Sequence, residues 1–310
     1  MNTKKSLELT EEQLRKINGK AFDLEALNSK YEELIDCFRY KMWLKEDVAF
    51  NVDTFKEILS SVSNKYIDER RHILIAMSWK YLRNNKASIL SPAFNFNQLI
   101  KTYIDYLQNI DERCPMSNIE YIEYFCSIHT CLISIKTSLD RVSQLFSYYY
   151  RCIPKYMTFG HIDSKGKYTN FLSVANQIAN SNKDGAEIFK YILDNYNDWI
   201  KECVAPRDQI IHYEDVERVL SCNEEFELFE PIGMSRKDGS TVNMETIKKY
   251  IEAFYSFIDR IFEYLLFETQ IVPPCDFNGL YLPSDKVKTY FDDLTYNPYT
   301  DTSLKSIFDK

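Results

Sequence analysis

The chain has 310 residues, of which 7 are glycine and 9 are proline. Together these make about 5% of the chain, against roughly 12% in average usage. Sandwiches, barrels and doubly wound α/β folds of this length need more turn residues than that, so the composition favours an all-α fold. The net charge of −8 excludes a globally basic surface and leaves only a local patch for holding nucleic acid. Aromatic residues make up 15% of the chain, so we expect a core packed largely from rings.

The cysteine pattern and the absence of long apolar runs bear on compartment and cofactors. No two of the eight cysteines form a C-x-x-C pair, and Cys126, His129 and Cys131 lack a fourth ligand, so we expect neither a metal site nor a cofactor. The N-terminal residues contain no apolar segment of the kind found in secretory signals, and nowhere do 18 apolar residues run together. We therefore expect a cytoplasmic protein that does not enter a membrane, with its reduced thiols buried as small hydrophobes.

The first third of the chain has the apolar spacing of helices. Thr10 to Gln13 form a capping-box pattern that opens a short helix, and residues 24–44 continue with apolar residues at steps of three and four. Residues 54–81, as one helix or a broken pair, and residues 96–107 follow as further helical segments. No group of polar residues in this region is typical of a catalytic or metal-binding site. We therefore predict an N-terminal helical subdomain over residues 1–112 that serves packing or partner recognition.

A long helix is expected from Ile119 to about residue 150. The segment that contains Pro115 interrupts the helical pattern, and a second capping box from Ser117 to Glu120 follows it. We therefore place the domain boundary there. We expect one face of the helix to be buried throughout, because its apolar residues step by three and four with one break. This predicted stripe is Ile119, Ile122, Cys126, His129, Ile133, Leu139, Val142, Phe146 and Tyr149. A lone histidine on an apolar face, such as His129, is more often a core residue than a functional one.

Further helices and one hairpin are expected in the rest of the chain. Residues 225–243 alternate around a turn that contains Gly239, which predicts a small inserted β-hairpin, and Asn243 can cap the helix after it. We predict a helical bundle over residues 113–270 and an ordered C-terminal extension over residues 271–310. The other expected elements are a loop over 160–167 and helices over 170–180, 185–203 and 244–267.

The segment from Pro206 to Glu214 carries the chemistry of the chain. Asp208 and His212 are four residues apart and share a helix face, whereas Arg207 and His212 point about 140° apart in a regular helix. Pro206 at the first helical position would put Arg207 in the first turn, from which it can reach toward His212. The trio then offers a cation for a phosphate, a proton-transfer group and an orienting carboxylate. The alternative is a simple helix cap with a surface pair.

The segment APRDQIIHYE resembles the R-x4-H motif of HEPN domains (higher eukaryotes and prokaryotes nucleotide-binding). The stretch CLISIKTSLDRVSQLF is similar to the first long HEPN helix, and the helices around the motif complete a four-helix pattern over residues 117–270. The resemblance implies a HEPN-like four-helix bundle and a metal-independent endoribonuclease of prokaryotic defence or toxin–antitoxin systems. An antitoxin or another defence-system protein is then an expected partner, with RNA as the substrate.

The resemblance also implies a homodimer in which the two motifs face one composite cleft. Arg207 would hold the scissile phosphate, and His212 would act as general base or acid while the ribose 2′-hydroxyl attacks the phosphorus to give a 2′,3′-cyclic phosphate. Asp208 would orient its neighbours. Such a reaction needs proton transfer and charge stabilisation but no metal ion, which agrees with the residues present.

Two alternatives stay open. The first is a non-catalytic HEPN-type helical module that binds a nucleotide, RNA or a partner protein, which the charge of −8 and the large N-terminal part favour. The second is an all-helical scaffold whose aromatics serve only packing, with a coincidental motif. The intact set of Arg207, Asp208 and His212 favours the ribonuclease.

Overall fold

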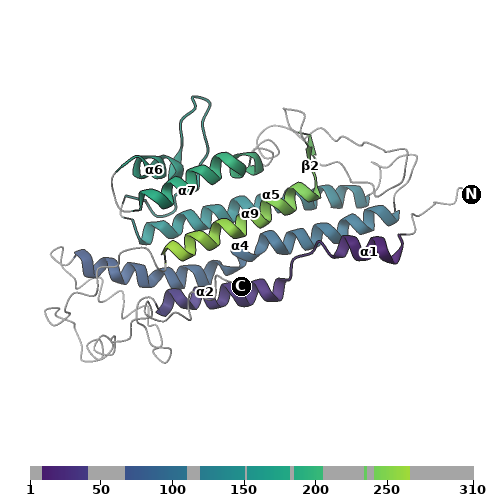
Figure 1. Ribbon diagram of the computed structural model, residues 1–310, viewed down its shortest axis with the longest axis horizontal. Coiled ribbons are helices and arrows are strands. Elements are labelled where there is room, and N and C mark those ends of the chain that lie inside the picture. Colours follow the sequence, from purple (N-terminus) through teal and green to yellow (C-terminus); the bar gives the residue numbers. More distant parts are fainter. Residues whose placement is uncertain are drawn as a thin grey trace, which may run out of the picture. The chain divides into compact units, whose positions relative to one another are not determined.

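Helices account for most of the part of the chain that the computed structural model describes, which is residues 9–40, 67–109, 119–150, 152–181, 185–204, 234–235 and 241–265. The expectation of a mostly helical, all-α protein is confirmed (Figure 1). The elements are α1 (Glu11–Asn18), α2 (Leu24–Tyr40), α4 (Ile67–Asn109), α5 (Ile119–Leu145), η2 (Phe146–Tyr148), α6 (Asn170–Ala179), α7 (Ala186–Asn195), η3 (Tyr196–Ile200), β1 (Met234–Ser235), β2 (Thr241–Val242) and α9 (Met244–Glu263).

The helix starts are explained by local side-chain chemistry. At α1 the predicted capping box is confirmed: the Thr10 hydroxyl accepts from the backbone N–H of Gln13 at 3.2 Å, and Gln13 Oε1 accepts from the N–H of Thr10 at 2.9 Å. Asp23 caps α2 by accepting from two backbone N–H groups of its first turn. Asn243 caps α9 as predicted, because its Oδ1 accepts from the N–H of Thr246 at 2.9 Å. These caps satisfy donors that have no partner within the helix.

The segments expected over residues 54–81 and 96–107 are one continuous helix, α4, as far as they are described, and Pro92 lies inside it. Proline has no N–H, and its ring displaces the carbonyl four residues earlier, so the helical ladder opens at this point. A hydroxyl from α9 fills the opening: Tyr255 donates to the carbonyl of Ile89 at 3.2 Å and accepts from the N–H of Ala93 at 3.4 Å. The helix therefore continues through a residue that would otherwise end it.

The carbonyl that Pro92 leaves without a helical donor is that of Ser88. The hydroxyl of Ser91, within α4, lies 2.9 Å from this oxygen, and the hydroxyl of Ser138 reaches it from α5. Ser138 also lies 2.7 Å from the carbonyl of Ser134 in its own helix, and its one proton can serve only one of the two at a time. The buried polar groups around Pro92 are thus satisfied by side chains from three helices.

The chain divides into two compact units, and each unit draws on three parts of the sequence. One comprises Met1–Ala26, Ala87–Asp140 and Tyr191–Phe257, and the other comprises Leu27–Lys86, Arg141–Lys190 and Ile258–Lys310. The helices α4, α5 and α9 each contribute to both units. The predicted boundary at residues 112 and 113 and the predicted extension over 271–310 lie outside the described residues, so that division stays a prediction.

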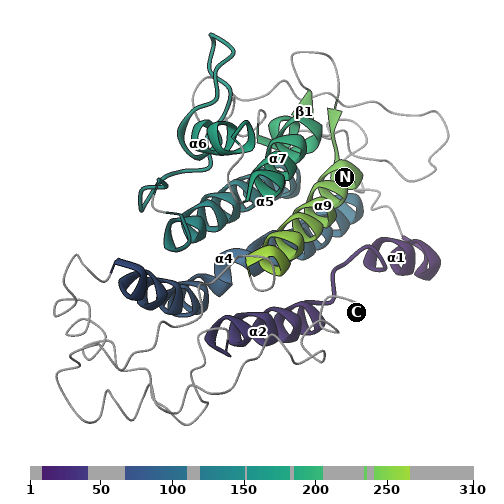
Figure 2. The same ribbon diagram turned by 60° about the vertical axis from the view of Figure 1, so that its left-hand side comes forward.

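In the first unit, α9 runs alongside α4, and aromatic rings join them to the start of the chain (Figure 2). The ring of Phe22 packs edge-on against Phe96 at 5.4 Å and Tyr255 at 6.2 Å between centroids. The side chain of Asn97 both donates to and accepts from the backbone of Phe22, each at 2.9 Å. The expected packing of the core from rings is confirmed here.

In the second unit, α2 is held on the end of α9 by a carboxylate. Asp259 accepts from the ammonium of Lys30 at 2.5 Å and from the hydroxyl of Tyr31 at 2.8 Å. A cluster of three buried rings joins η2, α6 and α7, and its centroid separations lie between 5.3 and 6.1 Å; its members are Phe146, Phe171 and Phe189. The predicted helix over residues 170–180 is confirmed as α6, which lies beside α7 in both ribbon views (Figures 1 and 2).

The buried face of α5 differs from the predicted one over the first half of the helix. Ile119, Ile122 and Ile133 are 61%, 45% and 37% exposed, Cys126 is exposed, and His129 is half-buried. The second half of the predicted stripe is buried, as expected. The buried positions of the first half lie roughly 180° around the helix from the predicted ones, by 100° per residue. They are Tyr124, Phe125, Ile128, Cys131, Leu132 and Ile135.

Candidate functional site

The three residues singled out for catalysis lie outside the described part of the chain. Arg207, Asp208 and His212 fall between Val204, where the description stops, and Met234, where it resumes. The structure therefore describes the two segments that flank the motif in the sequence. Both flanks belong to one compact unit, which includes Tyr191–Phe257.

The helix that enters the motif is anchored on α9. The predicted helix over 185–203 is present as α7 and η3, and it stays helical to Val204. The indole of Trp199 stacks on Tyr250 with centroids 6.4 Å apart and meets Phe257 edge-on at 6.2 Å. Its N–H donates to the side-chain oxygen of Asn195 at 2.9 Å. The chain thus reaches the motif from a fixed position on α9.

The turn before the motif is a π-helix, η3, which spans Tyr196–Ile200. A π-turn holds one residue more than an α-turn and rotates every later side chain by about 100° relative to a regular helix. Two amide side chains donate to carbonyls of the preceding turn: Asn195 to that of Tyr191 at 3.0 Å, and Asn197 to that of Leu193 at 2.9 Å. Single π-turns occur frequently at functional sites, and this one ends seven residues before Arg207.

Two buried thiols lie near each other, one of them on this entry helix. Cys203, on the entry helix, and Cys131, on α5, are both fully buried, and neither forms a disulfide. Burial raises the pKa of the Cys131 thiol far above its ordinary value, and the neighbouring Cys203 raises it further. A thiol held protonated is a poor nucleophile, so Cys131 packs as a small hydrophobe, as expected. The same expectation is wrong for Cys126 and Cys152, which are exposed.

The segment that returns from the motif ends in a short strand pair. β1 and β2 pair antiparallel with Met234 opposite Val242 and Ser235 opposite Thr241, directly before the Asn243 cap of α9. The remainder of the hairpin predicted over residues 225–243 lies largely outside the described residues, so the insert as a whole stays a prediction.

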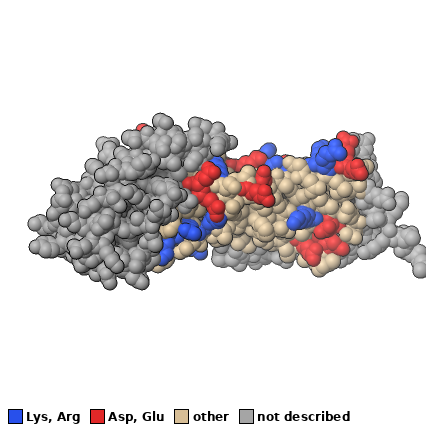
Figure 3. Space-filling model, turned by 90° about the horizontal axis from the view of Figure 1, so that it is seen from below, with Lys and Arg blue, Asp and Glu red and all other residues tan. Residues whose placement is uncertain are grey.

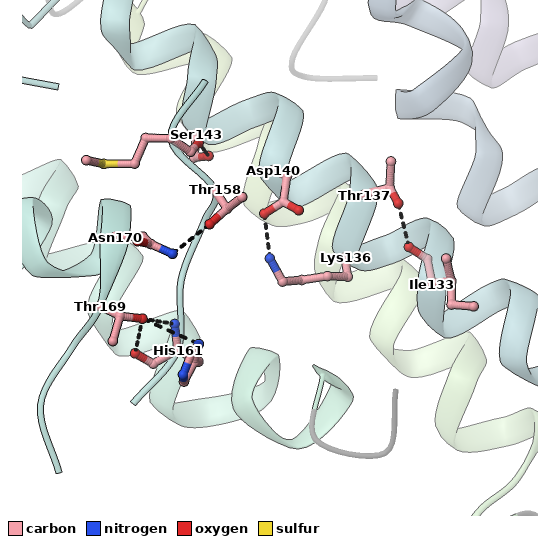
Figure 4. A network of polar contacts seen from close by, with 10 residues as sticks. Ile133, Lys136, Thr137, Asp140, Ser143, Thr158, His161, Thr169 and Asn170 are labelled. Carbon is pink, nitrogen blue, oxygen red and sulfur yellow. Dashed lines mark hydrogen bonds and ion pairs between the residues drawn. The ribbon is translucent and has the colours of Figure 1, made fainter. Parts of the chain in front are cut away.

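Other groups that could carry chemistry have structural roles where they are described. Lys136, on α5, forms an ion pair with Asp140 one turn later (Figure 4). Asp163 shapes its loop by accepting from the N–H groups of Lys165 at 2.9 Å and Lys167 at 2.8 Å. The backbone carbonyl of His161 accepts from the hydroxyl of Thr169 at 3.0 Å. Within the described ranges, no three His, Cys, Asp or Glu side chains are grouped so that they could hold a metal ion.

The lysines of α2 and α4 that have carboxylate partners, together with Lys20 just after α1, do not form a basic surface. On the face drawn in Figure 3, blue and red side chains occur in small groups among uncharged residues. Lys86 pairs with Glu32 and holds the pKa of that carboxyl below its usual value. Lys20 forms an ion pair with Glu245. Because counter-charges accompany these lysines, they are weak candidates for binding phosphates.

Comparisons of the chain with protein-family models, with curated proteins and with solved structures found no significant match. None of the helices in the described ranges is both long enough and apolar enough to cross a membrane.

Proposed function

We propose that the chain is a metal-independent endoribonuclease of HEPN type that acts in prokaryotic defence or in a toxin–antitoxin pair. The observation that carries the proposal is the set of Arg207, Asp208 and His212, which begins three residues after Val204, the last described residue of the buried entry helix. Support comes from the helices on either side of the motif and from the π-turn that precedes it.

In this proposal Arg207 binds the scissile phosphate and stabilises the charge that develops on its oxygens. His212 moves the protons: one copy removes the proton of the 2′-hydroxyl, and the other protonates the leaving 5′-oxygen. Asp208 fixes the orientation and tautomer of the imidazole. The 2′-oxygen forms the new bond to phosphorus as the bond to the 5′-oxygen breaks, which leaves a 2′,3′-cyclic phosphate and a 5′-hydroxyl.

The proposal includes a homodimer, in which two copies of the motif share one cleft. This arrangement suits a chain of net charge −8, because two copies of Arg207 concentrate positive charge without a basic surface. A partner protein, such as an antitoxin, would control access to that cleft.

The test is cleavage of mixed RNA by the purified chain in EDTA, together with the variants Arg207→Ala and His212→Ala. We expect wild type to cut and each variant to lose about 100-fold or more in rate, the typical contribution of a general base or an oxyanion donor. RNA with 2′-deoxy residues at the cut sites should resist cleavage, and the fragments should carry cyclic phosphate ends.

Matched controls are Arg15→Ala and His161→Ala, which remove an exposed arginine and an exposed histidine elsewhere. Both should keep wild-type activity. A folded wild type that leaves all RNA intact, with or without divalent metal, would refute the catalytic proposal. If that protein still binds RNA or a nucleotide, the non-catalytic helical module favoured by the negative net charge takes its place.

A further inference from the structure

A group of cations and tyrosine rings lies around the C-terminal end of α5, and all of its members belong to the second compact unit. It combines a side chain of α4, one of α5 and three from η2 and the segment that follows. We call it the basic–aromatic patch, and its members are Tyr81, Arg141, Tyr148, Lys155 and Tyr156. Each of these side chains is at least partly exposed, so the patch is part of the protein surface.

Direct contacts connect four of the five members. The rings of Tyr81 and Tyr148 lie 5.5 Å apart between centroids, and the ammonium of Lys155 lies 5.8 Å from the centroid of Tyr148. The hydroxyl of Tyr81 lies 3.0 Å from the backbone carbonyl of Arg141 and 3.1 Å from Oε1 of Gln144. The guanidinium of Arg141 approaches the same Oε1 to 3.5 Å. Both cations therefore border one pair of rings.

The two cations of the patch lack counter-charges. Within the described residues neither Arg141 nor Lys155 forms an ion pair, in contrast to Lys86, which pairs with Glu32. Arg141 has five N–H donors, and the described part of the chain gives them one long contact, at 3.5 Å, while its Nε is buried with no partner there. A cation of this kind can bind a phosphate without first giving up an ion pair, which matters in a chain of net charge −8.

Tyr156 adds an aromatic ring that the protein core does not use. The residue is 84% exposed, and its φ of +67° lies in the left-handed region that bulky side chains rarely adopt. Burial raises the pKa of the Tyr148 hydroxyl, and the neighbouring Tyr156 raises it further, so the fifth member lies close to the other four. Strained backbone positions cluster at binding sites, and an exposed ring beside cations is suited to stacking.

Hydrogen bonds hold the segment that directly follows Tyr156. Ser143, on α5, donates to the carbonyl of Met157 at 3.2 Å. Asn170, at the start of α6, donates to the hydroxyl of Thr158 at 2.7 Å (Figure 4). The ring is therefore presented from a segment that is fixed on two helices, so little ordering entropy is lost when a ligand binds to it.

We infer that the basic–aromatic patch binds single-stranded nucleic acid, with a base stacked on Tyr156 and phosphates held by Lys155 and Arg141. An exposed ring beside cations is the combination with which proteins hold single strands without reading their sequence. The patch and the R-x4-H motif belong to different compact units, and the inference does not require the chain to cleave RNA. Bases and phosphates are common to RNA and DNA, so both should bind, with a dissociation constant of about 1–100 μM at physiological salt.

The first test is fluorescence anisotropy of a labelled oligothymidine of about ten nucleotides, titrated with the full chain. This DNA has no 2′-hydroxyl, so the proposed cleavage reaction cannot consume it. Tyr156→Ala should weaken binding about fivefold or more, because one stacked base is lost, whereas Tyr156→Phe keeps the ring and should bind like wild type. A matching RNA, oligouridine, is titrated with the His212→Ala chain and should bind with similar affinity. Thermal unfolding checks that each variant folds.

The second test separates charge from stacking by its dependence on salt. For a single strand the logarithm of the binding constant falls with the logarithm of the salt concentration by about 0.7 for each phosphate contact, so two contacts predict a slope of about −1.4. Lys155→Ala should halve this slope and weaken binding, and Tyr156→Ala should leave the slope unchanged. Lys190→Ala is the matched control, because it removes one charge from an exposed lysine of α7 in the same unit and should change neither quantity.

A third arm adds polyglutamate, which carries negative charge but no bases. We expect it to displace the oligothymidine far less well than unlabelled oligothymidine at equal charge, because it cannot stack. Equal displacement would mean that the patch is an anion-binding surface for acidic proteins, and it would overturn the inference.

Two other results would also overturn the inference. One is a chain that does not bind the oligothymidine up to about 1 mM, ten times the weakest expected constant. The other is binding that both Tyr156→Ala and Lys155→Ala leave unchanged. RNA cleavage is scored separately. A chain that binds through the patch without cutting RNA supports this inference and refutes the ribonuclease, whereas a chain that cuts RNA but binds single strands elsewhere does the reverse.

Discussion

Removing the hydroxyl of Tyr255 should destabilise the protein at the proline of α4. Tyr255→Phe keeps the ring, which packs against Phe22 and Phe254, and deletes only the group that bridges Ile89 and Ala93. The carbonyl and the N–H that it serves are backbone groups of a buried stretch. Leaving either of them without a hydrogen bond lowers the free energy of unfolding by about 1–3 kcal/mol.

Two features of the geometry place the expected cost at the lower end. The two hydrogen bonds are long, at 3.2 and 3.4 Å. Ile89 and Ala93 are also four residues apart, so the turn can partly close and recover one direct bond. We therefore expect a loss of about 1–2 kcal/mol in free energy of unfolding, with a roughly tenfold loss of hydrogen-exchange protection at the Ala93 amide.

The assay combines urea unfolding with hydrogen exchange, which reports on the turn itself. Tyr156→Phe is the matched control, because that side chain is 84% exposed and should change the free energy of unfolding by less than about 0.5 kcal/mol. If Tyr255→Phe is as stable as wild type and Ala93 keeps its protection, the hydroxyl does not maintain α4 through the proline and the reasoning is refuted.

Three more predictions concern other sites in the fold. Ser91→Ala and Ser138→Ala should each lower the free energy of unfolding by about 0.5 kcal/mol, because the other hydroxyl can still serve the Ser88 carbonyl. Together they should lower it by about 2–3 kcal/mol, more than the sum of the two; an additive double-mutant cycle in urea unfolding would contradict this. Gly185→Ala should cost about 1–3 kcal/mol in the same assay, because Gly185 has a φ of +89° and a Cβ there would lie 2.4 Å from a tyrosine hydroxyl. Burial raises the pKa of Cys131 and of Tyr149, so both groups bind protons more tightly in the folded state than in the unfolded state. The free energy of unfolding should therefore fall above pH 9 to 10, by about 1.4 kcal/mol per pH unit for each group, and Tyr149→Phe should make this fall with pH less steep. An alkaline unfolding curve that Tyr149→Phe leaves unchanged would count against the last of these.

Features that depend on neighbours in the sequence could be predicted. The caps at Thr10 and Asn243 need only a side chain and a backbone N–H three residues away, so the pattern that predicts them also contains their physical cause. The continuity of α4 could not be predicted in this way. It depends on Tyr255, which reaches Pro92 only after the chain has folded, and no local pattern indicates that a distant hydroxyl will bridge the gap.

The candidate site also has a part that could be predicted from local sequence and a part that could not. The types and spacing of Arg207, Asp208 and His212 are local facts, and they are enough to propose a reaction. Whether their side chains converge is a tertiary property, as it is for the face of any helix. Sequence analysis also did not predict the π-turn before the motif, because the two asparagine side chains that accompany it read as ordinary polar positions of a helix.

The first half of α5 shows why periodicity alone could not choose its buried face. It carries two apolar stripes at steps of three and four: one includes Ile119 and Ile133, and the other includes Ile128 and Ile135, roughly half a turn away. A helix that is apolar on opposite sides normally has both sides covered. The fold of one chain covers the stripe of Ile128, and the other remains in water, where apolar surface is unfavourable. The mistaken prediction therefore has a physical cause: the residues of both stripes are suited to burial, and the spacing of apolar residues does not show which stripe the fold covers.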